Sequence, residues 1–125
     1  MKRISRSLLL AIFILLFCAP SAFSQEPRKL LIFHSPTCHR CLEAKEKTIP
    51  NILSEFSGKL AVEYRDIQII ENYKLLLSLQ KYFTPDLTLD LPVFFMEGRL
   101  VNASGNLDLK LRELIVEALA DQKSG

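Results

Sequence analysis

The sequence predicts an α/β fold in which a four-stranded mixed sheet, built in the order β-α-β-α-β-β-α, has helices on both faces. Three observations support this prediction. Short apolar runs alternate along the chain with longer segments whose apolar residues recur at helical spacing. The first two runs are joined by such a segment, which is typical of parallel strands with a right-handed crossover. The last two runs flank the turn signal Glu97-Gly98, which is typical of an antiparallel hairpin.

The first 24 residues have the pattern of a secretory signal peptide. A basic start is followed by an uninterrupted apolar run over residues 8–19, and small residues then precede Gln25. The basic residues are Lys2, Arg3 and Arg6, and the small residues are Ala22 and Ser24. The apolar run is short for a membrane span, which needs about 20 residues. We therefore expect a signal peptide over residues 1–24, cleavage before Gln25 and one domain over residues 25–125.

This prediction implies an extracytoplasmic location, either periplasmic or secreted. Two alternatives stay open: the segment is retained as a membrane anchor, or the protein is a lipoprotein processed at Cys18. The bulky Phe17 directly before Cys18 argues against lipoprotein processing.

Removal of residues 1–24 changes the charge and the cysteine count. The full chain has 16 basic and 14 acidic residues, and the segment contains three basic residues and no acidic one, which leaves 13 against 14, a net charge of −1. This balance gives no support for nucleic-acid binding. Cys38 and Cys41 are the two cysteines that remain, and they form one Cys-x-x-Cys motif. In an oxidising compartment, such an isolated and closely spaced pair is more often catalytic than structural.

The motif lies between a predicted strand and a predicted helix. Residues 29–34 are nearly all apolar, as in a central strand covered on both faces, and Pro36 helps to end the strand. A helix is predicted from Cys38 to Ser57. Cys38 then lies at the helix N-terminus, where free backbone N–H groups and the helix dipole favour a thiolate. Cys41 lies about one turn further on, close enough to attack a disulfide formed by Cys38.

The predicted helix over residues 38–57 has an apolar stripe on one side and charges on the other. The stripe consists of Leu42, Ile49, Ile52, Leu53 and Phe56, and the charged face consists of Glu43, Lys45, Glu46 and Lys47. Pro50 lies inside the helix and should kink or divide it. Gly58 is a suitable stop signal.

The rest of the domain follows the same logic. The predicted elements are a strand at residues 60–66, a helix at 71–83, a loop at 84–91, strands at 93–96 and 99–103, and a helix at 107–120. The first of these strands has the alternating pattern Ala61-Val62-Glu63-Tyr64. The last helix carries its apolar residues at i, i+3, i+4 and i+7, namely Leu111, Leu114, Ile115 and Ala118.

With these segments in place, residues 25–125 resemble the thioredoxin-like family of thiol-disulfide oxidoreductases, as an exported, minimal thioredoxin- or glutaredoxin-type domain. The resemblance rests on four segments, which are Phe33 to Cys41, Phe56 to Leu60, Leu91-Pro92-Val93-Phe94-Phe95 and the Glu97-Gly98 hairpin. It implies that Pro92 is a cis-proline beside the motif and that the backbone of Leu91 pairs with an extended substrate peptide. A simple strand-edge proline is the alternative for Pro92.

The resemblance also implies protein thiols and disulfides as substrates and a membrane-embedded thiol transporter as electron supplier. We expect no cofactor, no bound metal and a monomer. Three positions depart from the family pattern: Ile32 replaces a buried acid, Thr37 replaces a tryptophan, and His39-Arg40 replaces Gly-Pro. These departures leave open the direction of the reaction and the identity of the substrate.

The expected chemistry uses Cys38 as the nucleophile and Cys41 as the resolving thiol, and the two form a disulfide in each cycle. His39 and Arg40 are expected to lower the pKa of Cys38 below about 8.5, the alternative being two solvated side chains. His34 either assists proton transfer or is an ordinary polar residue at the end of a strand. Glu63 either replaces the missing buried acid or occupies an exposed strand position.

Two other classes of protein stay open beside the oxidoreductase. The first is a metal-binding protein that uses His34, Cys38, His39 and Cys41 as ligands. Its ligand set is incomplete, because no second Cys-x-x-Cys or distant histidine pair completes it. The second is a non-catalytic module that binds peptides along the Leu91 edge. Two intact cysteines argue against it.

Overall fold

The computed structural model describes residues 5–17 and 26–121. The elements are α1 (Arg6–Phe17), β1 (Arg28–His34), α2 (His39–Glu43), the π-helix η1 (Ala44–Thr48), α3 (Ile49–Glu55), β2 (Leu60–Asp66), α4 (Ile70–Phe83), β3 (Val93–Met96), β4 (Arg99–Val101) and α5 (Leu107–Ala120). Every strand and helix that the sequence predicts between residues 26 and 121 is present. The element order of the prediction is therefore confirmed.

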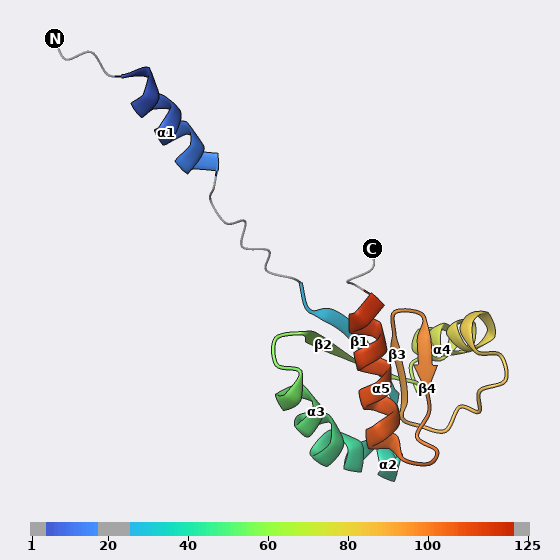
Figure 1. The fold of residues 1–125 in the computed structure, drawn as a ribbon. Coiled ribbons are helices and arrows are strands. Elements are labelled where there is room, and N and C mark those ends of the chain that lie inside the picture. Colours follow the sequence, from blue (N-terminus) through green and yellow to red (C-terminus); the bar gives the residue numbers. More distant parts are fainter. Residues whose placement is uncertain (1–4, 18–25, 122–125) are drawn as a thin grey trace.

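The sheet has four strands in the order β2-β1-β3-β4 (Figure 1). β1 and β2 are parallel, with Ile32 opposite Tyr64 and His34 opposite Asp66. β3 is antiparallel to β1 and to β4. This is the four-stranded mixed sheet that the sequence predicts, with the parallel pair joined by the helical stretch that follows the motif.

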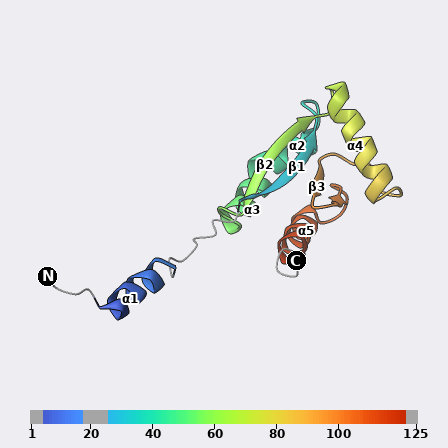
Figure 2. The ribbon, with the colours of Figure 1, turned by 90° about the horizontal axis from the view of Figure 1, so that it is seen from above.

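Helices cover both faces of the sheet, also as predicted. Alternate residues of β1 point to opposite faces. Leu30 and Ile32 belong to the core cluster formed with α3 and α5, and Phe33 belongs to the cluster formed with α4. Figure 2 shows α4 on one side of the strands and α3 and α5 on the other. β1 is therefore covered on both faces, which explains its nearly continuous apolar sequence.

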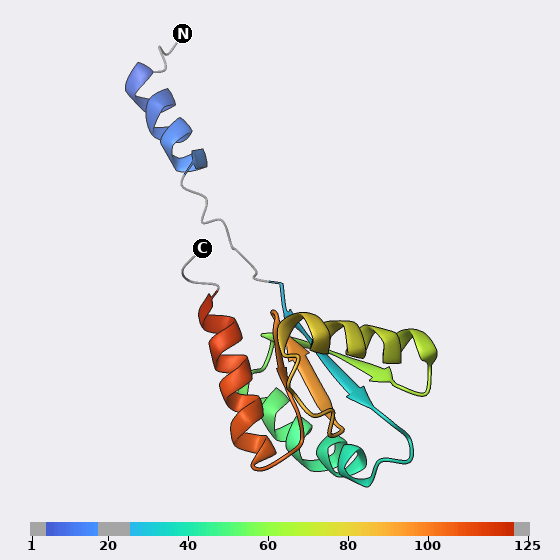
Figure 3. The same cartoon turned by 90° about the vertical axis from the view of Figure 1, so that its right-hand side faces the viewer.

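The helical stretch after the motif is divided, as Pro50 predicts. Figure 3 shows β1 leading through a short turn into α2, and the stretch continues through η1 into α3. The π-helical turn ends two residues before Pro50, whose nitrogen carries no hydrogen and whose ring disfavours a regular preceding turn. Gly58, at φ 77°, follows the end of the stretch.

The apolar stripe predicted for this stretch is wrong at its first position. Leu42 is exposed, and the side chains that face the sheet there are Cys41 and Ala44. The π turn explains the difference, because it adds one residue and changes the phase of the helix. The buried positions Ala44 and Ile49 are five residues apart, so a stripe counted back from Ile49 at α-helical spacing reaches the wrong residue.

β4 is shorter than predicted and ends at Val101 instead of Ala103. The reason is a competing set of hydrogen bonds. The Ala103 N–H donates to the carbonyl of Asp90 (3.1 Å), and the side chain of Asn102 donates to the carbonyl of Thr88 (2.9 Å). Residues 102 and 103 thus bind the loop before β3 instead of extending the hairpin.

α1 contains most of the apolar run of the predicted signal peptide. The large apolar side chains between residues 8 and 15 are exposed. In the part of the chain that the structure describes, no helix combines the length and the apolar character needed to cross a membrane. Cys18 and the predicted cleavage point before Gln25 lie outside the described residues, so signal-peptide processing stays a prediction.

Candidate active site

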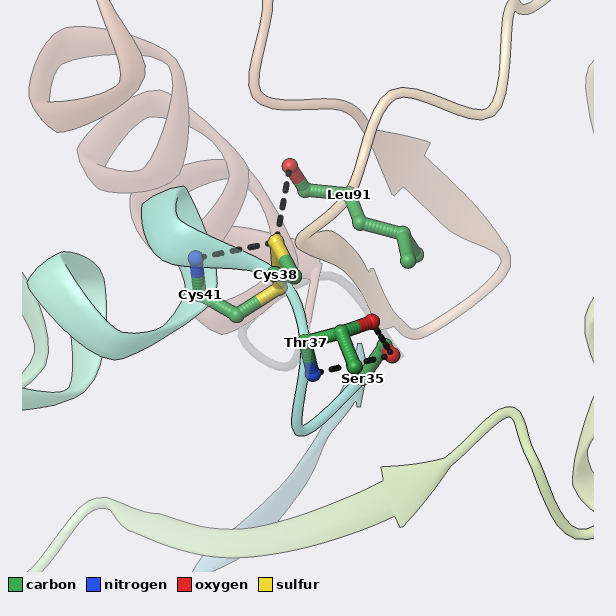
Figure 4. Close-up of a disulfide and its surroundings, with 5 residues drawn as sticks. All are labelled: Ser35, Thr37, Cys38, Cys41 and Leu91. Carbon is green, nitrogen blue, oxygen red and sulfur yellow. Dashed lines mark hydrogen bonds between the residues drawn. A yellow bond between two sulfur atoms is a disulfide. The ribbon is translucent and has the colours of Figure 1, made fainter.

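The Cys-x-x-Cys motif follows the carboxyl end of β1 after a turn held by serine. The Ser35 carbonyl accepts the Cys38 N–H (3.1 Å), and the Ser35 Oγ accepts the Thr37 N–H (3.4 Å) and lies 3.1 Å from Thr37 Oγ1 (Figure 4). These bonds give partners to backbone groups of the turn that have no partner in the sheet, because β1 ends at His34. The turn thereby fixes where the first sulfur enters the helical stretch.

Cys38 is the N-cap of α2. Its backbone is extended (φ −87°, ψ 110°), and its sulfur accepts a hydrogen bond from the backbone N–H of Cys41 at 3.1 Å. The two cysteines form a disulfide, with their Cα atoms 5.2 Å apart. Cys38 is half-buried, whereas Cys41 is 7% exposed. A sulfur that accepts a helix N–H in this way is stabilised in its anionic form once the disulfide is reduced.

The loop before β3 brings a carbonyl oxygen to the same sulfur. The peptide bond between Leu91 and Pro92 is cis, the geometry that the resemblance implies. The carbonyl oxygen of Leu91 lies 3.9 Å from the Cys38 Sγ (Figure 4), and Pro92 is buried. The structure thus brings Leu91 and Pro92 to the disulfide from more than 50 positions away in the chain.

A polar group centred on one buried asparagine, which we call the loop clamp, holds this loop in place. It consists of Asn102, Ser104 and Lys110. Asn102 is 3% exposed, and its Oδ1 accepts hydrogen bonds from Ser104 Oγ (2.7 Å) and from the Lys110 ammonium. Its Nδ2 donates to the Thr88 carbonyl, three residues before Leu91. Sequence reasoning missed the clamp, because the strand predicted over residues 99–103 includes Asn102.

His39 and Arg40, the predicted pKa-tuning residues, are exposed on the first turn of α2. Arg40 lines a surface depression of about 630 Å³ together with Asp90, Ser104 and Gly105. Because Asp90 directly precedes Leu91, this depression adjoins the surface on which the resemblance places a substrate peptide.

A second cavity, of about 230 Å³, lies against the disulfide itself. Cys38, Cys41, His34, Lys45, Tyr64 and Pro92 contribute to its wall. The rings of His34 and Tyr64 meet edge to face with centroids 5.6 Å apart, and the Lys45 Nζ lies 5.2 Å from the centroid of the Tyr64 ring. Burial raises the pKa of Tyr64 above its ordinary value of 10.0. We call His34, Lys45 and Tyr64 the rear cluster.

Glu63 does not take the place of the missing buried acid. Its carboxylate pairs with Lys29 (3.1 Å) and with Arg65 (2.7 Å), and it is not part of the wall of the cavity beside Cys41. The hydrogen bond from Lys29, with the charges of Arg65 and Lys29, lowers its pKa below 4.5. The reason is strand alternation, which points Tyr64 toward the motif and Glu63 toward the opposite face.

The four ligands of the alternative metal site are not gathered as such a site requires. Across residues 5–17 and 26–121, no group of three or more histidine, cysteine, aspartate or glutamate side chains is placed to hold a metal ion.

These features define a thioredoxin-like fold with a Cys-x-x-Cys pair at the start of a helical stretch and a cis-proline beside it. No protein-family model and no curated protein sequence matches the chain. Among solved structures, the chain is similar to the germline-specific thioredoxin Deadhead from Drosophila melanogaster. The identity is 18%, the match covers 75% of this chain and 83% of that one, and the TM-score is 0.45.

Proposed function

We propose that this protein is an exported thiol-disulfide oxidoreductase that acts on protein disulfides and dithiols. One observation carries the redox part of the proposal, and export rests on the signal-peptide pattern of residues 1–24. The Cys38 Sγ accepts the backbone N–H of Cys41 at 3.1 Å while it is bonded to the Cys41 sulfur and 3.9 Å from the Leu91 carbonyl. Once the disulfide is reduced, this sulfur would be stabilised as a thiolate and would lie beside a second thiol and the backbone of Leu91.

The reaction transfers two electrons in two exchanges. The Cys38 thiolate attacks one sulfur of a substrate disulfide, the substrate S–S bond breaks, and the other substrate sulfur leaves as a thiolate. Cys41 then loses its proton and attacks Cys38, which releases the second substrate thiolate and forms the Cys38–Cys41 disulfide. The reverse sequence oxidises a substrate dithiol. Leu91 would bind the substrate backbone, and a membrane-embedded thiol transporter would return electrons to the oxidised protein.

Trapping tests this function. The Cys41→Ser variant should accumulate a mixed disulfide between Cys38 and a protein substrate, because the resolving step is lost. The Cys38→Ser variant is the matched control and should accumulate none. A Cys41→Ser protein that forms no adduct with an unfolded disulfide-containing protein would contradict the proposal.

Two further measurements address the alternatives. N-terminal sequencing of the exported protein should find a start at or near Gln25, whereas an intact Met1 in the membrane fraction would favour an anchor.

The purified, reduced protein should contain well under one equivalent of zinc or copper, because the ligand set is incomplete. Stoichiometric, tightly held metal would favour the metal-binding alternative.

A further inference from the structure

The resolving step raises a question that the proposed cycle leaves unanswered. Cys41 is 7% exposed, and a buried thiol ordinarily has a raised pKa, because burial disfavours the thiolate. It must nevertheless lose a proton before it can attack Cys38. Ile32 occupies the wall of the adjoining cavity where an acidic side chain would be able to act, and Glu63 is turned to the opposite face.

We propose that His34 is the proton acceptor for Cys41, with Lys45 and Tyr64 as the residues that position it and stabilise the thiolate. The inference rests on the proposed oxidoreductase function and assigns a step within it. It concerns the rear cluster, whose three members come from β1, from η1 and from β2.

Strand alternation places two of these side chains under the motif. Leu30 and Ile32 face α3 and α5, so His34, two residues further along β1, lies on the same face. Val62 packs on that face from β2, and Tyr64 follows it by two residues. The parallel register sets Tyr64 opposite Ile32, directly beside the position of His34.

The helical stretch also lines the cavity. Lys45 follows Cys41 by four residues, which brings both side chains to one side of the stretch. The cavity that these elements enclose, about 230 Å³, is bounded by both cysteines as well as by the rear cluster. Since one water has a share of about 30 Å³ in the liquid, the cavity can hold water between the His34 ring and the Cys41 sulfur. Proton transfer directly or through one water is an ordinary route in general base catalysis.

The chemistry of the three groups assigns their roles. An unperturbed histidine has a pKa of about 6.5, so it can accept a proton near neutral pH. A lysine is ordinarily protonated there and supplies a positive charge that favours a nearby thiolate. Tyr64 stays neutral, because burial raises its pKa further above 10.0. Its ring contacts the His34 ring edge to face and has the Lys45 ammonium over its face, so it helps to fix the positions of both side chains.

One acidic residue also stands near His34. Asp66 is the register partner of His34 on β2, and its Oδ1 accepts the backbone N–H of Gln68 at 2.9 Å. Asp66 is thus the acidic residue that the strand register sets beside His34. The charged and titratable groups around His34 are therefore Asp66, Tyr64, Lys45 and the two cysteines.

The step balances in protons and electrons. The Cys41 thiol gives its proton to a neutral nitrogen of the His34 ring, and the resulting thiolate attacks the Cys38 sulfur. A bond forms between the two enzyme sulfurs as the bond from Cys38 to the substrate breaks, and the electron pair leaves on the substrate sulfur. That thiolate then takes a proton from the imidazolium or from water. In the oxidising direction the same proton returns to Cys41.

The experiment separates the two exchanges of the cycle. Reduced protein is mixed with a peptide disulfide in single turnover, and the decay of the mixed disulfide is followed between pH 5 and pH 9. In the unaltered protein this decay should accelerate with an apparent pKa near that of histidine. His34→Gln should slow it about 100-fold and remove this dependence, since general bases contribute about 10²–10⁴-fold. The rate at which Cys38 is alkylated should be nearly the same in His34→Gln as in the unaltered protein, because the first exchange does not use His34.

Matched variants distinguish proton transfer from a structural role. Lys45→Met should slow the decay by a smaller factor than His34→Gln, and Lys81→Met, on the exposed face of α4, should leave it unchanged. His34→Ala should be slow but recover when imidazole is added, which a purely structural defect would not do. If the histidine variants do not fold, the pH dependence of the decay in the unaltered protein tests the assignment, because a histidine base predicts an apparent pKa near that of histidine.

The outcomes that overturn this assignment differ from those that overturn the function. Decay that is equally fast in His34→Gln, or that follows only a thiol pKa above about 8.5, overturns the role of His34. Absence of any mixed disulfide in Cys41→Ser overturns the oxidoreductase function instead.

Discussion

The two sulfurs of the redox pair lie in regions that are built differently. The region around Cys38 is built from backbone: a helix N–H at 3.1 Å and the Leu91 carbonyl at 3.9 Å. The region behind Cys41 is built from side chains, with His34 and Tyr64 projecting from two neighbouring strands. Cys38 is half-buried and Cys41 is buried, and the cavity lined by the rear cluster borders both and is partly open at Lys45 and Tyr64.

The backbone groups around Cys38 come with the fold, whereas the side chains behind Cys41 are particular to this sequence. A helix N-terminus and a loop carbonyl are present whatever the neighbouring side chains are, so nucleophile activation depends little on sequence beyond the motif. The rear region depends on which side chains the strand register and the helical stretch bring together, and here these carry an imidazole, an ammonium and a phenol. We therefore expect the attack by Cys38 to tolerate substitution and the resolution by Cys41 to be sensitive to it.

The largest expected effect tests the asymmetry of the two sulfurs directly. When the reduced protein is treated with an alkylating agent at mildly acidic pH, Cys38 should react at least about tenfold faster than Cys41. Each unit of difference in thiol pKa changes the thiolate fraction tenfold, and Cys38 is also the more exposed. Mass spectrometry of peptides locates the label, and the Cys38→Ser and Cys41→Ser variants give the individual rates. Faster labelling of Cys41 would reverse the assignment.

The next effect concerns the clamp that holds the backbone side of the site. Asn102→Ala should lower the free energy of unfolding by about 1–2 kcal/mol, because it leaves the Thr88 carbonyl without its side-chain donor. The Lys110 ammonium loses one acceptor but keeps those of Ser104. The substitution should also raise the KM for a protein disulfide, since the loop that carries Leu91 loses an anchor. Urea denaturation and steady-state kinetics measure the two effects.

The control for the clamp is Asn51→Ala, at an exposed position of α3. It should change stability by no more than about 0.5 kcal/mol. Equal losses in the two variants would mean that the clamp adds nothing to the stability of the loop.

Sequence reasoning reached the backbone-built region and missed most of the other. The motif and the element order follow from local signals such as apolar runs and turn residues, and the structure agrees with them. The cis geometry of Pro92 follows from the family resemblance, and the structure has it as well. The exposed Leu42 was misplaced because a π turn, which has no clear sequence signal, shifts the phase of the helix.

The rear cluster and the loop clamp depend on tertiary register, which a single sequence does not specify. Glu63 and Tyr64 are adjacent in the chain, and which of them faces the motif is decided by the pairing of β2 with β1. Likewise, the sequence predicts Asn102 as part of a strand, because it does not show that the loop over residues 84–91 passes beside this residue. Chemistry carried by one short motif is thus predictable, whereas chemistry assembled from several strands is not.

A smaller effect tests the placement of Glu63 on the face opposite the motif. Its pKa is lowered, first by the hydrogen bond from Lys29, so the folded protein holds this carboxylate ionised more firmly than the unfolded chain does. The resulting stability is fully present above the ordinary pKa of 4.5 and is lost as the pH falls through the lower value of the folded state. Glu63→Gln should therefore flatten the loss of stability below pH 4.5, as measured by thermal unfolding across that range.

The same variant has a second readout that bears on the two regions. Glu63→Gln should leave the decay of the mixed disulfide unchanged, because the carboxylate does not border the cavity beside Cys41. Glu113→Gln, at an exposed position of α5, is the control for a simple change of charge. A slower decay in Glu63→Gln alone would move Glu63 into the rear region.

The smallest expected effect concerns the side chains nearest the backbone-built region. If its charge acts on the Cys38 sulfur, Arg40 favours the thiolate, and hence the dithiol form of the protein over the disulfide. Arg40→Ala should then raise the pKa of Cys38 and make the couple more reducing. An exposed charge pair contributes about 0.5–1 kcal/mol, which for two electrons corresponds to about 10–20 mV. Replacement of both His39 and Arg40 by neutral residues should move the potential further in the same direction.

Equilibration against a glutathione buffer measures the potential, and thiolate absorbance measures the pKa of Cys38. Lys81→Met, on α4, is the control for the loss of a positive charge far from the motif. An unchanged potential in Arg40→Ala would mean that the guanidinium serves only the depression that it shares with Asp90 and Ser104. On the Cys38 side, the potential would then be set by backbone groups alone. Side chains would contribute only in the region behind Cys41.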